Sequence, residues 1–391
     1  EWLPIIKTLI GGLHKVAGQD DQRAWFVNSR TPLNHAQEPA RAQMQINGNP
    51  LRGLSQWYAL RNDEETRELA EKLARFMSKR GTWGNTGGEA PTMVDAYQHA
   101  KWLSHFHGFT TGVVGMTEYA IATHDVKLLR FLKSFYEYSR QFGSVRIGFF
   151  PAVISTLKDR HAIQQRVYGG KGQNDEGCAL AEMIYIAIQL SEAGVGNYWD
   201  DVDSMVRNHL VEHQMLDRER LKHIITHSPK FEMRPGINNT EDVIERNIGA
   251  FTSCAEPTKM YAWWTMCCNA NMMWAMYEAW EATVRFDNGT AQVNLLLNRA
   301  SPWVDIDSHL PYEGKVVLRN KKASQMSVRI PLWADKKEVR SEVNGRETPP
   351  DWLGRQLLIR GLQPNDTVTI TFPMVETTET HTEPSYETTY T

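Results

Sequence analysis

Residues 116–138, MTEYAIATHDVKLLRFLKSFYEY, contain two helical patterns on either side of a short polar turn. After the turn, apolar side chains return at helical steps of 4, 7 and 8, at Leu128, Leu132, Phe135 and Tyr136. The spacing predicts two antiparallel helices joined by the turn, an αα-hairpin. The first helix is more apolar than the second, so we expect it to lie deeper in the core.

The same arrangement occurs in two further stretches of the chain. Residues 54–77 repeat the spacing after a turn at 62–65, where Asn62 and Glu65 fit a capping box. Residues 179–210 form a third copy with a Gly-rich turn at 192–196. A single hairpin cannot bury both of its faces, so several must stack together. We therefore predict an (α/α)6 barrel of helical hairpins over residues 1–285, with a solenoid of helix pairs as the alternative.

After residue 286 the apolar period changes from that of a helix to that of a strand. The segments are short, rich in β-branched residues and separated by turn residues, which predicts a C-terminal antiparallel β-sandwich domain over residues 286–391. Asn-Gly pairs at 47–48, 288–289 and 344–345 predict turns. The expected strands are 291–297, 315–318, 326–330, 339–343, 357–359 and 367–372.

The composition excludes several classes of protein. The chain has 391 residues, 41% of them hydrophobic, and a formal net charge of −3, so it is not disordered as a whole. It has no basic excess or stripe of the kind that binds nucleic acid, and no apolar run long enough to span a membrane. Because it begins at Glu1 rather than Met, the lack of a signal peptide carries no information. A cytoplasmic and a periplasmic location both remain open.

The four cysteines are too few for a disulfide framework and are unevenly placed. Cys178, Cys267 and Cys268, together with Glu176, supply the four ligands that a tetrahedral zinc site requires. Both clusters precede predicted helices, whose N-termini favour thiolates. Packing of free thiols in the core is the alternative reading. Cys254 has no partner motif, and we expect it to be a buried free thiol.

Two of these motifs resemble a known family. The run Asp175-Glu176-Gly177-Cys178 is similar to the Glu-x-Cys motif of the zinc-dependent β-L-arabinofuranosidases of glycoside hydrolase family 127. The run 267–271, CCNAN, resembles that family's Cys-Cys-x-x-Asn motif, and segments 293–295, 311–315 and 329–333 fit its chain order. The resemblance implies an (α/α)6 barrel followed by β-sandwich material. It also implies that Glu176, Cys178, Cys267 and Cys268 hold Zn²⁺, with Cys267 as the nucleophile.

One departure from the family concerns its general acid/base, a Glu a short way before the zinc-binding Glu. Residues 150–174 contain no Glu, and Asp159 is their only acidic residue. A leaving alkoxide needs a proton donor. Either Asp159 or a residue from another loop donates this proton, or the chain catalyses a different reaction. The stretch is cationic, which suits an acidic sugar, although a solvated basic loop is the alternative. Arg160 and Arg166 are candidate substrate contacts, His161 and Tyr168 are candidate bases for elimination, and Lys158 and Lys171 add positive charge.

Further substrate contacts are expected from histidine and tryptophan side chains. His105 and His107 are two positions apart, so on a helix they face different directions and at most one would reach a site. His107 is the candidate, against the alternative of a core histidine. Trp263 and Trp264 precede the cysteine pair, and Trp264 could stack on a sugar or pack in the core.

The sequence therefore predicts a carbohydrate-active enzyme of polysaccharide degradation whose partner is an oligosaccharide. The specific expectation is a retaining exo-glycosidase, β-L-arabinofuranosidase-like, that uses a zinc-held Cys267 thiolate on oligosaccharide ends. A lyase or dehydratase acting on oligosaccharides that bear uronic acids is the alternative. A sugar-binding barrel with a purely structural zinc is the second alternative. The sequence carries no signal for the oligomeric state.

Overall fold

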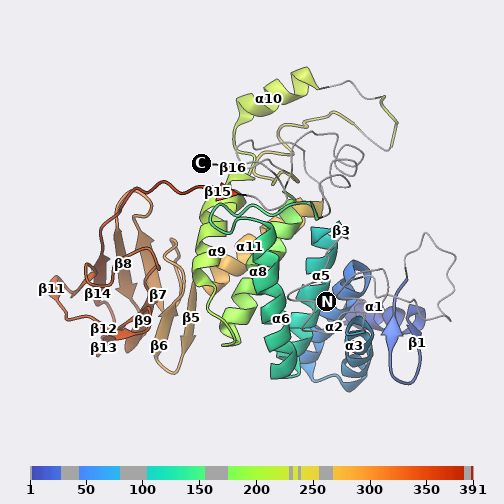
Figure 1. The fold of residues 1–391 in the computed structure, drawn as a ribbon, viewed down its shortest axis with the longest axis horizontal. Coiled ribbons are helices and arrows are strands. Elements are labelled where there is room, and N and C mark those ends of the chain that lie inside the picture. The colour runs from blue at the N-terminus through green and yellow to red at the C-terminus, as the bar shows by residue number, and fades with distance from the viewer. Residues whose placement is uncertain are drawn as a thin grey trace.

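A computed structural model describes residues 2–27, 44–79, 104–154, 175–228, 232–236, 239–254, 267–382 and 389–390. Helices come first along the chain and strands follow, and the two groups lie side by side (Figure 1). This confirms the predicted order of a helical part and a C-terminal sheet region. In the described ranges, no helix is both long and apolar enough to cross a membrane.

All three predicted hairpins are present. In the second and third hairpins, a long, well-buried helix is paired with a more amphipathic or shorter one, as expected. In the first hairpin the expectation is wrong, because a larger share of the second helix is buried than of the first. The pairs are α2 (Met44–Arg61) with α3 (Glu64–Met77), α5 (Phe106–Ala122) with α6 (Val126–Ser139), and α8 (Gly177–Glu192) with α9 (Trp199–Met205). The other described helices are α1 (Trp2–Val16), α10 (Arg218–His227) and α11 (Cys267–Ala282).

Two of the three hairpin turns are closed by aspartate caps. The Asp63 side chain accepts a hydrogen bond from the backbone N–H of Thr66, and Asp125 accepts one from Leu128. Each cap satisfies a backbone donor that the helix leaves unpaired. The expected capping box at Asn62 is wrong by one residue, because Asn62 takes a positive φ of 52° in the turn itself.

The turn predicted at Asn47-Gly48 is also wrong, because both residues lie inside α2. A Cβ atom at Gly48 would stand 2.6 Å from the backbone of Thr111 and Gly112 on α5, so glycine is needed where the two helices cross. The Asn47 side chain accepts a hydrogen bond from the Phe26 N–H at 2.8 Å. Helix packing, which local sequence rules do not see, determines both residues.

The C-terminal strands form two five-stranded sheets, with orders β11-β10-β14-β8-β7 and β12-β13-β9-β6-β5. The prediction of purely antiparallel pairing is wrong at one place, because β6 and β9 run parallel to each other. The inward-facing side chains of both sheets belong to one hydrophobic cluster, separate from that of the helices. The Asn-Gly turns at 288–289 and 344–345 are present, with positive φ at all four residues. The strands are β5 (Val284–Asp287), β6 (Thr290–Val293), β7 (Val304–Ser308), β8 (Lys315–Asn320), β9 (Gln325–Arg329), β10 (Arg340–Val343), β11 (Arg346–Glu347), β12 (Asp351–Leu353), β13 (Gln356–Arg360) and β14 (Thr367–Thr371).

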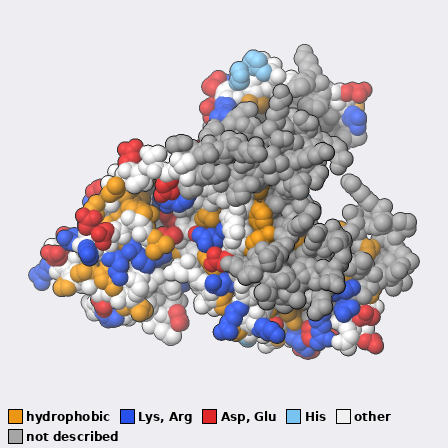
Figure 2. Space-filling view, in the orientation of Figure 1, with side chains coloured by type: hydrophobic (Ala, Val, Ile, Leu, Met, Phe, Trp, Pro, Cys, Tyr) orange, Lys and Arg blue, Asp and Glu red, His pale blue; other side chains and the backbone are white. Residues whose placement is uncertain are grey.

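Each of the six predicted strand segments contains a strand, whereas β5, β7, β11 and β12 were not expected. The first of these, β5, starts only two residues after α11 ends, inside the range assigned to helices. The sheets contact the helical part through a buried arginine: Arg329 is fully buried, and its Nη1 lies 3.0 Å from Asp200 of α9. On the face seen in Figure 2, acidic and basic side chains are interspersed over the strands.

Three short strand pairs complete the described chain. The pair that matters for the site is β3 (Ser104–His105) with β4 (Val153–Ile154), which lies at the start of α5. From β14 the chain returns to the helical part, where β15 (His381–Thr382) pairs with β16 (Thr389–Tyr390) (Figure 1). Near the N-terminus, β1 (Gly18–Gln19) pairs with β2 (Ala24–Trp25).

Candidate metal centre

Glu176, Cys178, Cys267 and Cys268 meet at one point in the structure. One carboxylate oxygen and three Sγ atoms all lie within 4.8 Å of one another. The Sγ of Cys178 is 3.2 Å from that of Cys268 and 3.6 Å from that of Cys267. Three sulfur donors and one carboxylate form a donor set that suits Zn²⁺ better than Mg²⁺ or Ca²⁺. The residues present therefore fit a zinc ion.

Two helix N-termini bring the four residues together. Glu176 and Cys178 stand at the start of α8, and Cys267 and Cys268 form the first turn of α11. A Cβ atom at Gly177 would lie 3.2 Å from the Cβ of Cys268 and 2.3 Å from Met272 Sδ. Gly177 therefore permits the close approach of the helix ends, which explains the glycine between the two proposed ligands.

Hydrogen bonding to Cys267 raises the pKa of the Cys178 thiol, and the pKa of Cys268 is raised as well, whereas that of Cys267 is lowered. Two features of the surroundings nevertheless favour a negative sulfur. The partial positive charge at each helix N-terminus stabilises a negative sulfur. The Asn271 side chain donates a hydrogen bond to Cys178 Sγ at 3.1 Å. Asn271 is the Asn of the Cys-Cys-x-x-Asn motif, for which the sequence analysis assigned no function.

Cys267 differs from the other two cysteines of the group. Its side chain is exposed, whereas Cys178 and Cys268 are buried. Hydrogen bonds from the Cys178 and Cys268 thiols lower the pKa of Cys267 well below the usual range of a thiol. The group therefore presents one accessible sulfur with thiolate character, which is what a nucleophile requires.

His105 holds the carboxylate of the group from the side of β3. Its Nε2 lies 2.5 Å from Oε2 of Glu176. The ring also stands edge-to-face with that of His107, at a centroid distance of 5.3 Å. The sequence argument that only one of these histidines reaches a site does not apply, because His105 precedes α5 and only His107 lies on the helix.

His107 is buried and paired with a second carboxylate. Its Nδ1 lies 3.0 Å from Oε1 of Glu182, and that oxygen also accepts a hydrogen bond from Thr111 at 2.7 Å. Burial lowers the pKa of His107, but the Glu182 carboxylate outweighs it, and the pKa rises to about 9. His107 is therefore charged at neutral pH. The sequence analysis missed Glu182, because nothing in the sequence pattern distinguishes this one position on an apolar helix.

A second buried group lies beside the first. Asp175, His209 and His213 each offer one ligand atom, and these atoms too lie within 4.8 Å of one another. Asp175 belongs to this second group although it adjoins Glu176, because the extended backbone at Glu176 turns neighbouring side chains to opposite sides. Burial lowers the pKa of His213, but Asp175 outweighs it and raises that pKa. The His-x-x-x-His spacing at 209–213 is a sequence signal that could have identified this group.

Several predicted site residues cannot be placed relative to these groups. The following candidates lie outside the described residues: His161, Tyr168, Arg160, Arg166 and Trp264. The same is true of four further residues named above, Asp159, Lys158, Lys171 and Trp263. Cys254 is a buried free thiol, as predicted.

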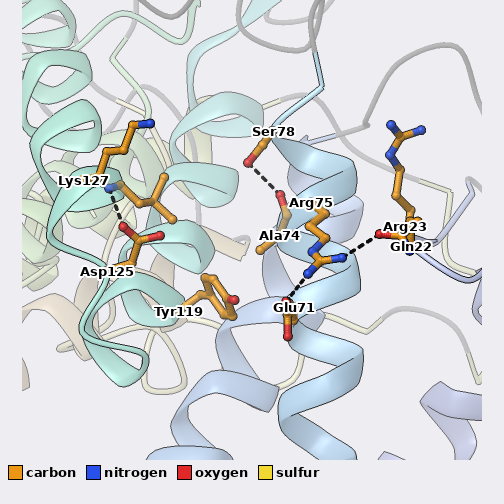
Figure 3. Close-up of a pocket in the computed structure, with 10 residues that line it drawn as sticks. Gln22, Arg23, Glu71, Ala74, Arg75, Ser78, Tyr119, Asp125 and Lys127 are labelled. Carbon is orange, nitrogen blue, oxygen red and sulfur yellow. Dashed lines mark hydrogen bonds and ion pairs between the residues drawn. The ribbon is translucent and has the colours of Figure 1, made fainter.

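The pocket in Figure 3 is a different part of the molecule. It has a volume of about 570 Å³ and is lined by residues of α3, α5 and α6 and of the segment between β1 and β2. Two of its charged side chains are already paired: Arg75 donates to Gln22 at 2.9 Å and pairs with Glu71. None of the proposed metal ligands lines it, so it is not the candidate site.

Comparisons with known proteins identify the fold. No protein-family profile matches the sequence, and no curated protein matches it. Among solved structures, a family 127 β-L-arabinofuranosidase from Geobacillus stearothermophilus matches with a TM-score of 0.56 and 15% identity over 89% of this chain. A second family 127 β-arabinofuranosidase matches with a TM-score of 0.59 and 15% identity over 95% of the chain. A third structure, a glycoside hydrolase, matches with a TM-score of 0.55 and 14% identity over 83% of this chain.

The chain spans 56% of the length of each of these three structures. At such low identity the likeness establishes the fold, and it agrees with the resemblance that the two cysteine motifs carry. All three of these structures are named as glycoside hydrolases or arabinofuranosidases. The chain thus shares its fold with the β-L-arabinofuranosidases of glycoside hydrolase family 127.

Proposed function

We propose that this chain is a retaining glycosidase that removes a sugar from the end of an oligosaccharide, with Cys267 as its nucleophile. The single observation that carries the proposal is the grouping of Cys267 with Glu176, Cys178 and Cys268 at the N-termini of α8 and α11. The fold likeness supports the sugar substrate. A β-L-arabinofuranoside is the substrate named for one of the matched structures.

The four-residue group is proposed to hold Zn²⁺. When bound there, zinc would keep the cysteines deprotonated and fix the direction of the Cys267 sulfur. The chain contributes the orientation of the ligands, through His105 on Glu176 and Asn271 on Cys178. Because Cys178 and Cys268 are buried, we assign them to the metal alone.

The reaction would run in two steps. The Cys267 thiolate attacks the anomeric carbon, a carbon–sulfur bond forms and the glycosidic carbon–oxygen bond breaks. The leaving oxygen takes a proton from a general acid. Water then attacks the same carbon, gives up a proton to the base formed in the first step, and releases the sugar and the thiolate, so the configuration is retained.

The remaining roles are assigned from the sequence. We propose that the proton donor comes from residues 155–174, where Asp159, His161 and Tyr168 are the candidates. Arg160, Arg166 and Trp264 would contact the substrate. His107, which is buried and charged at neutral pH, would contact the sugar beside Cys267. The negative charge of Cys267 helps to raise the pKa of His107.

We extend the proposal to the architecture around the site. The helical hairpins would form an (α/α)6 barrel over residues 1–285, and the two sheets a β-sandwich domain over 286–391. Separate hydrophobic clusters for the helices and the sheets support this division.

The test is hydrolysis of an aryl β-L-arabinofuranoside and of arabinose-capped oligosaccharides, with the anomeric form of the first product followed by NMR. The expected result is release of the sugar with its β configuration retained. Inverted product, or no turnover by the zinc-loaded chain on any neutral or acidic oligosaccharide, would overturn the proposal.

The lyase or dehydratase alternative rests on the absence of Glu from residues 150–174 and on their positive charge. It predicts an unsaturated uronate that absorbs in the ultraviolet when the chain acts on oligosaccharides bearing uronic acids. A sugar-binding protein with a structural zinc would bind such ligands and leave them intact.

A further inference from the structure

The structure contains a second group of converging ligand atoms that the proposed reaction does not use. Asp175 Oδ2, His209 Nδ1 and His213 Nε2 form a nearly equilateral triangle. The distances are 3.0 Å from Asp175 to His209, 3.2 Å from Asp175 to His213, and 3.2 Å between the two histidine nitrogens. All three side chains are almost fully buried.

The hydrogen bonding of His213 decides what this triangle can hold. Its Nδ1 lies 3.3 Å from the carbonyl oxygen of Thr252, and a carbonyl only accepts, so Nδ1 carries a proton. In neutral His213 the other nitrogen, Nε2, then presents a lone pair to the carboxylate oxygen of Asp175. Two lone pairs 3.2 Å apart in a buried place repel each other unless a proton or a metal ion lies between them.

The dimensions of the triangle match those of a metal site. Zinc bound to nitrogen and oxygen at about 2.0–2.1 Å in a tetrahedron places its ligand atoms about 3.3 Å apart. The three observed separations, 3.0 to 3.2 Å, are close to that value. The contact from His213 to the Thr252 carbonyl is also the outer hydrogen bond that a metal-bound imidazole usually makes.

The local backbone adds an independent observation. Residues Val206–Leu210, which include His209, form a π-helical turn. Such turns are rare and occur mostly at functional sites. The Nε2 of His209 is buried with no hydrogen-bond partner, and the ring is held by edge-to-face contact with Phe149 at 5.9 Å.

We propose that Asp175, His209 and His213 bind a second divalent metal ion, and that the ion is Zn²⁺. Two imidazoles and one carboxylate suit zinc, and the deep burial suits a structural ion that does not meet the substrate. Asp175 is followed directly by Glu176, so this ion would fix the backbone that carries two ligands of the first site. The inference does not depend on the glycosidase reaction.

The position of the site relative to the fold supports this structural role. The backbone at Asp175 bridges to Pro151, and the Gly177 N–H donates to the Ser253 carbonyl oxygen at 2.9 Å. An ion held by Asp175 and the two histidines would therefore tie the start of α8 to the helical segment that carries 209–213 and to the chain at 252–253.

The test counts zinc in the full chain. The protein is stripped with a chelator, reloaded with Zn²⁺ alone, desalted and analysed for metal, with His213→Gln and His209→Gln compared against His309→Gln on the sheet domain. We expect two zinc ions per chain for the unchanged protein and for His309→Gln, and one for each of the other variants. An equal zinc content in the unchanged protein and in both histidine variants would overturn the proposal.

A measurement on the unchanged chain covers the case in which the buried variants fail to fold. Anomalous scattering from a zinc-loaded crystal should give a peak about 2.0–2.1 Å from Asp175 Oδ2, His209 Nδ1 and His213 Nε2. A peak there and none at the cysteines would support this inference while contradicting the proposed function. Absence of a peak there would mean that a proton on His213 occupies the triangle, and the inference would be wrong.

Discussion

The Sγ atoms of Cys178 and Cys267 lie 3.6 Å apart although 89 positions separate the two residues in the chain. The contact joins the first turn of α8 to the first turn of α11, so the proposed nucleophile is held by the packing of two helices. Loss of one sulfur should therefore affect metal binding and chemistry together, and the fold much less.

The first prediction concerns Cys267 itself. Cys267→Ser should abolish glycoside hydrolysis and weaken zinc binding by more than the roughly 10–100-fold that loss of an outer hydrogen bond costs. Cys254→Ser is the matched control, since Cys254 is also a free thiol but lies outside the group. Turnover and zinc titration measure both effects. Full activity of Cys267→Ser with zinc still bound would contradict the assigned role.

The second prediction concerns the hydrogen bond between His105 and Glu176. His105→Ala should leave the four ligands in place but lower zinc affinity by about 10–100-fold, because the carboxylate loses the partner that orients it. His223→Ala, a change on the exposed α10, should leave the affinity unchanged. Competition with a chromophoric chelator measures the difference. Equal affinities for the two variants would show that His105 does not position Glu176.

The third prediction concerns pH. The pKa of His107 is about 9 in the folded chain, above its ordinary 6.5, mainly because the Glu182 carboxylate outweighs burial. The stability that this pair contributes is complete below pH 6.5 and is lost as the pH rises through about 9. A pKa shift from 6.5 to about 9 corresponds to about 3 kcal/mol of free energy of unfolding.

Glu182→Gln should remove most of that pH dependence, because the amide is neutral and of similar size. The free energy of unfolding, measured by urea titration across this pH range, should fall with pH in the unchanged chain and stay nearly flat in the variant. Glu192→Gln, which alters a pair with Arg285 instead, should behave like the unchanged chain. Parallel pH profiles for Glu182→Gln and the unchanged chain would contradict the pairing.

The fourth prediction concerns the crossing of α2 and α5. Gly48→Ala should destabilise the fold by about 1–3 kcal/mol, because the new Cβ meets the backbone of α5. Gly53→Ala is on the same helix, but nothing lies within 4 Å of its Cβ position, so it should stabilise by about 0.5–1 kcal/mol. Urea unfolding of both variants shows whether each change raises or lowers the free energy of unfolding. A stabilising Gly48→Ala would mean that the helices are not in contact there.

The sequence predicted those features that depend on local pattern. The hairpins and strands follow from apolar spacing, and the four proposed ligands follow from two short motifs. The structure added what depends on packing between distant segments. Gly48 looked like a turn because its close contact is with α5, and the pairing of His107 with Glu182 has no spacing that marks it in the sequence.

His105 shows the same limit at the site. Its distance from His107 in the sequence suggested that it faced elsewhere, but it lies in β3 before the helix begins, where helical geometry does not apply. The triangle of Asp175, His209 and His213 joins residues from two segments more than thirty positions apart, so only the two histidines could have been recognised together.

The measurement that tests the central claim most directly is peptide mapping of the zinc-loaded chain quenched with acid during turnover of an aryl β-L-arabinofuranoside. The account predicts a pentosyl adduct on the peptide that contains Cys267, and no adduct on that peptide in Cys267→Ser. An adduct on a carboxylate, or steady turnover of Cys267→Ser at the rate of the unchanged chain, would contradict it.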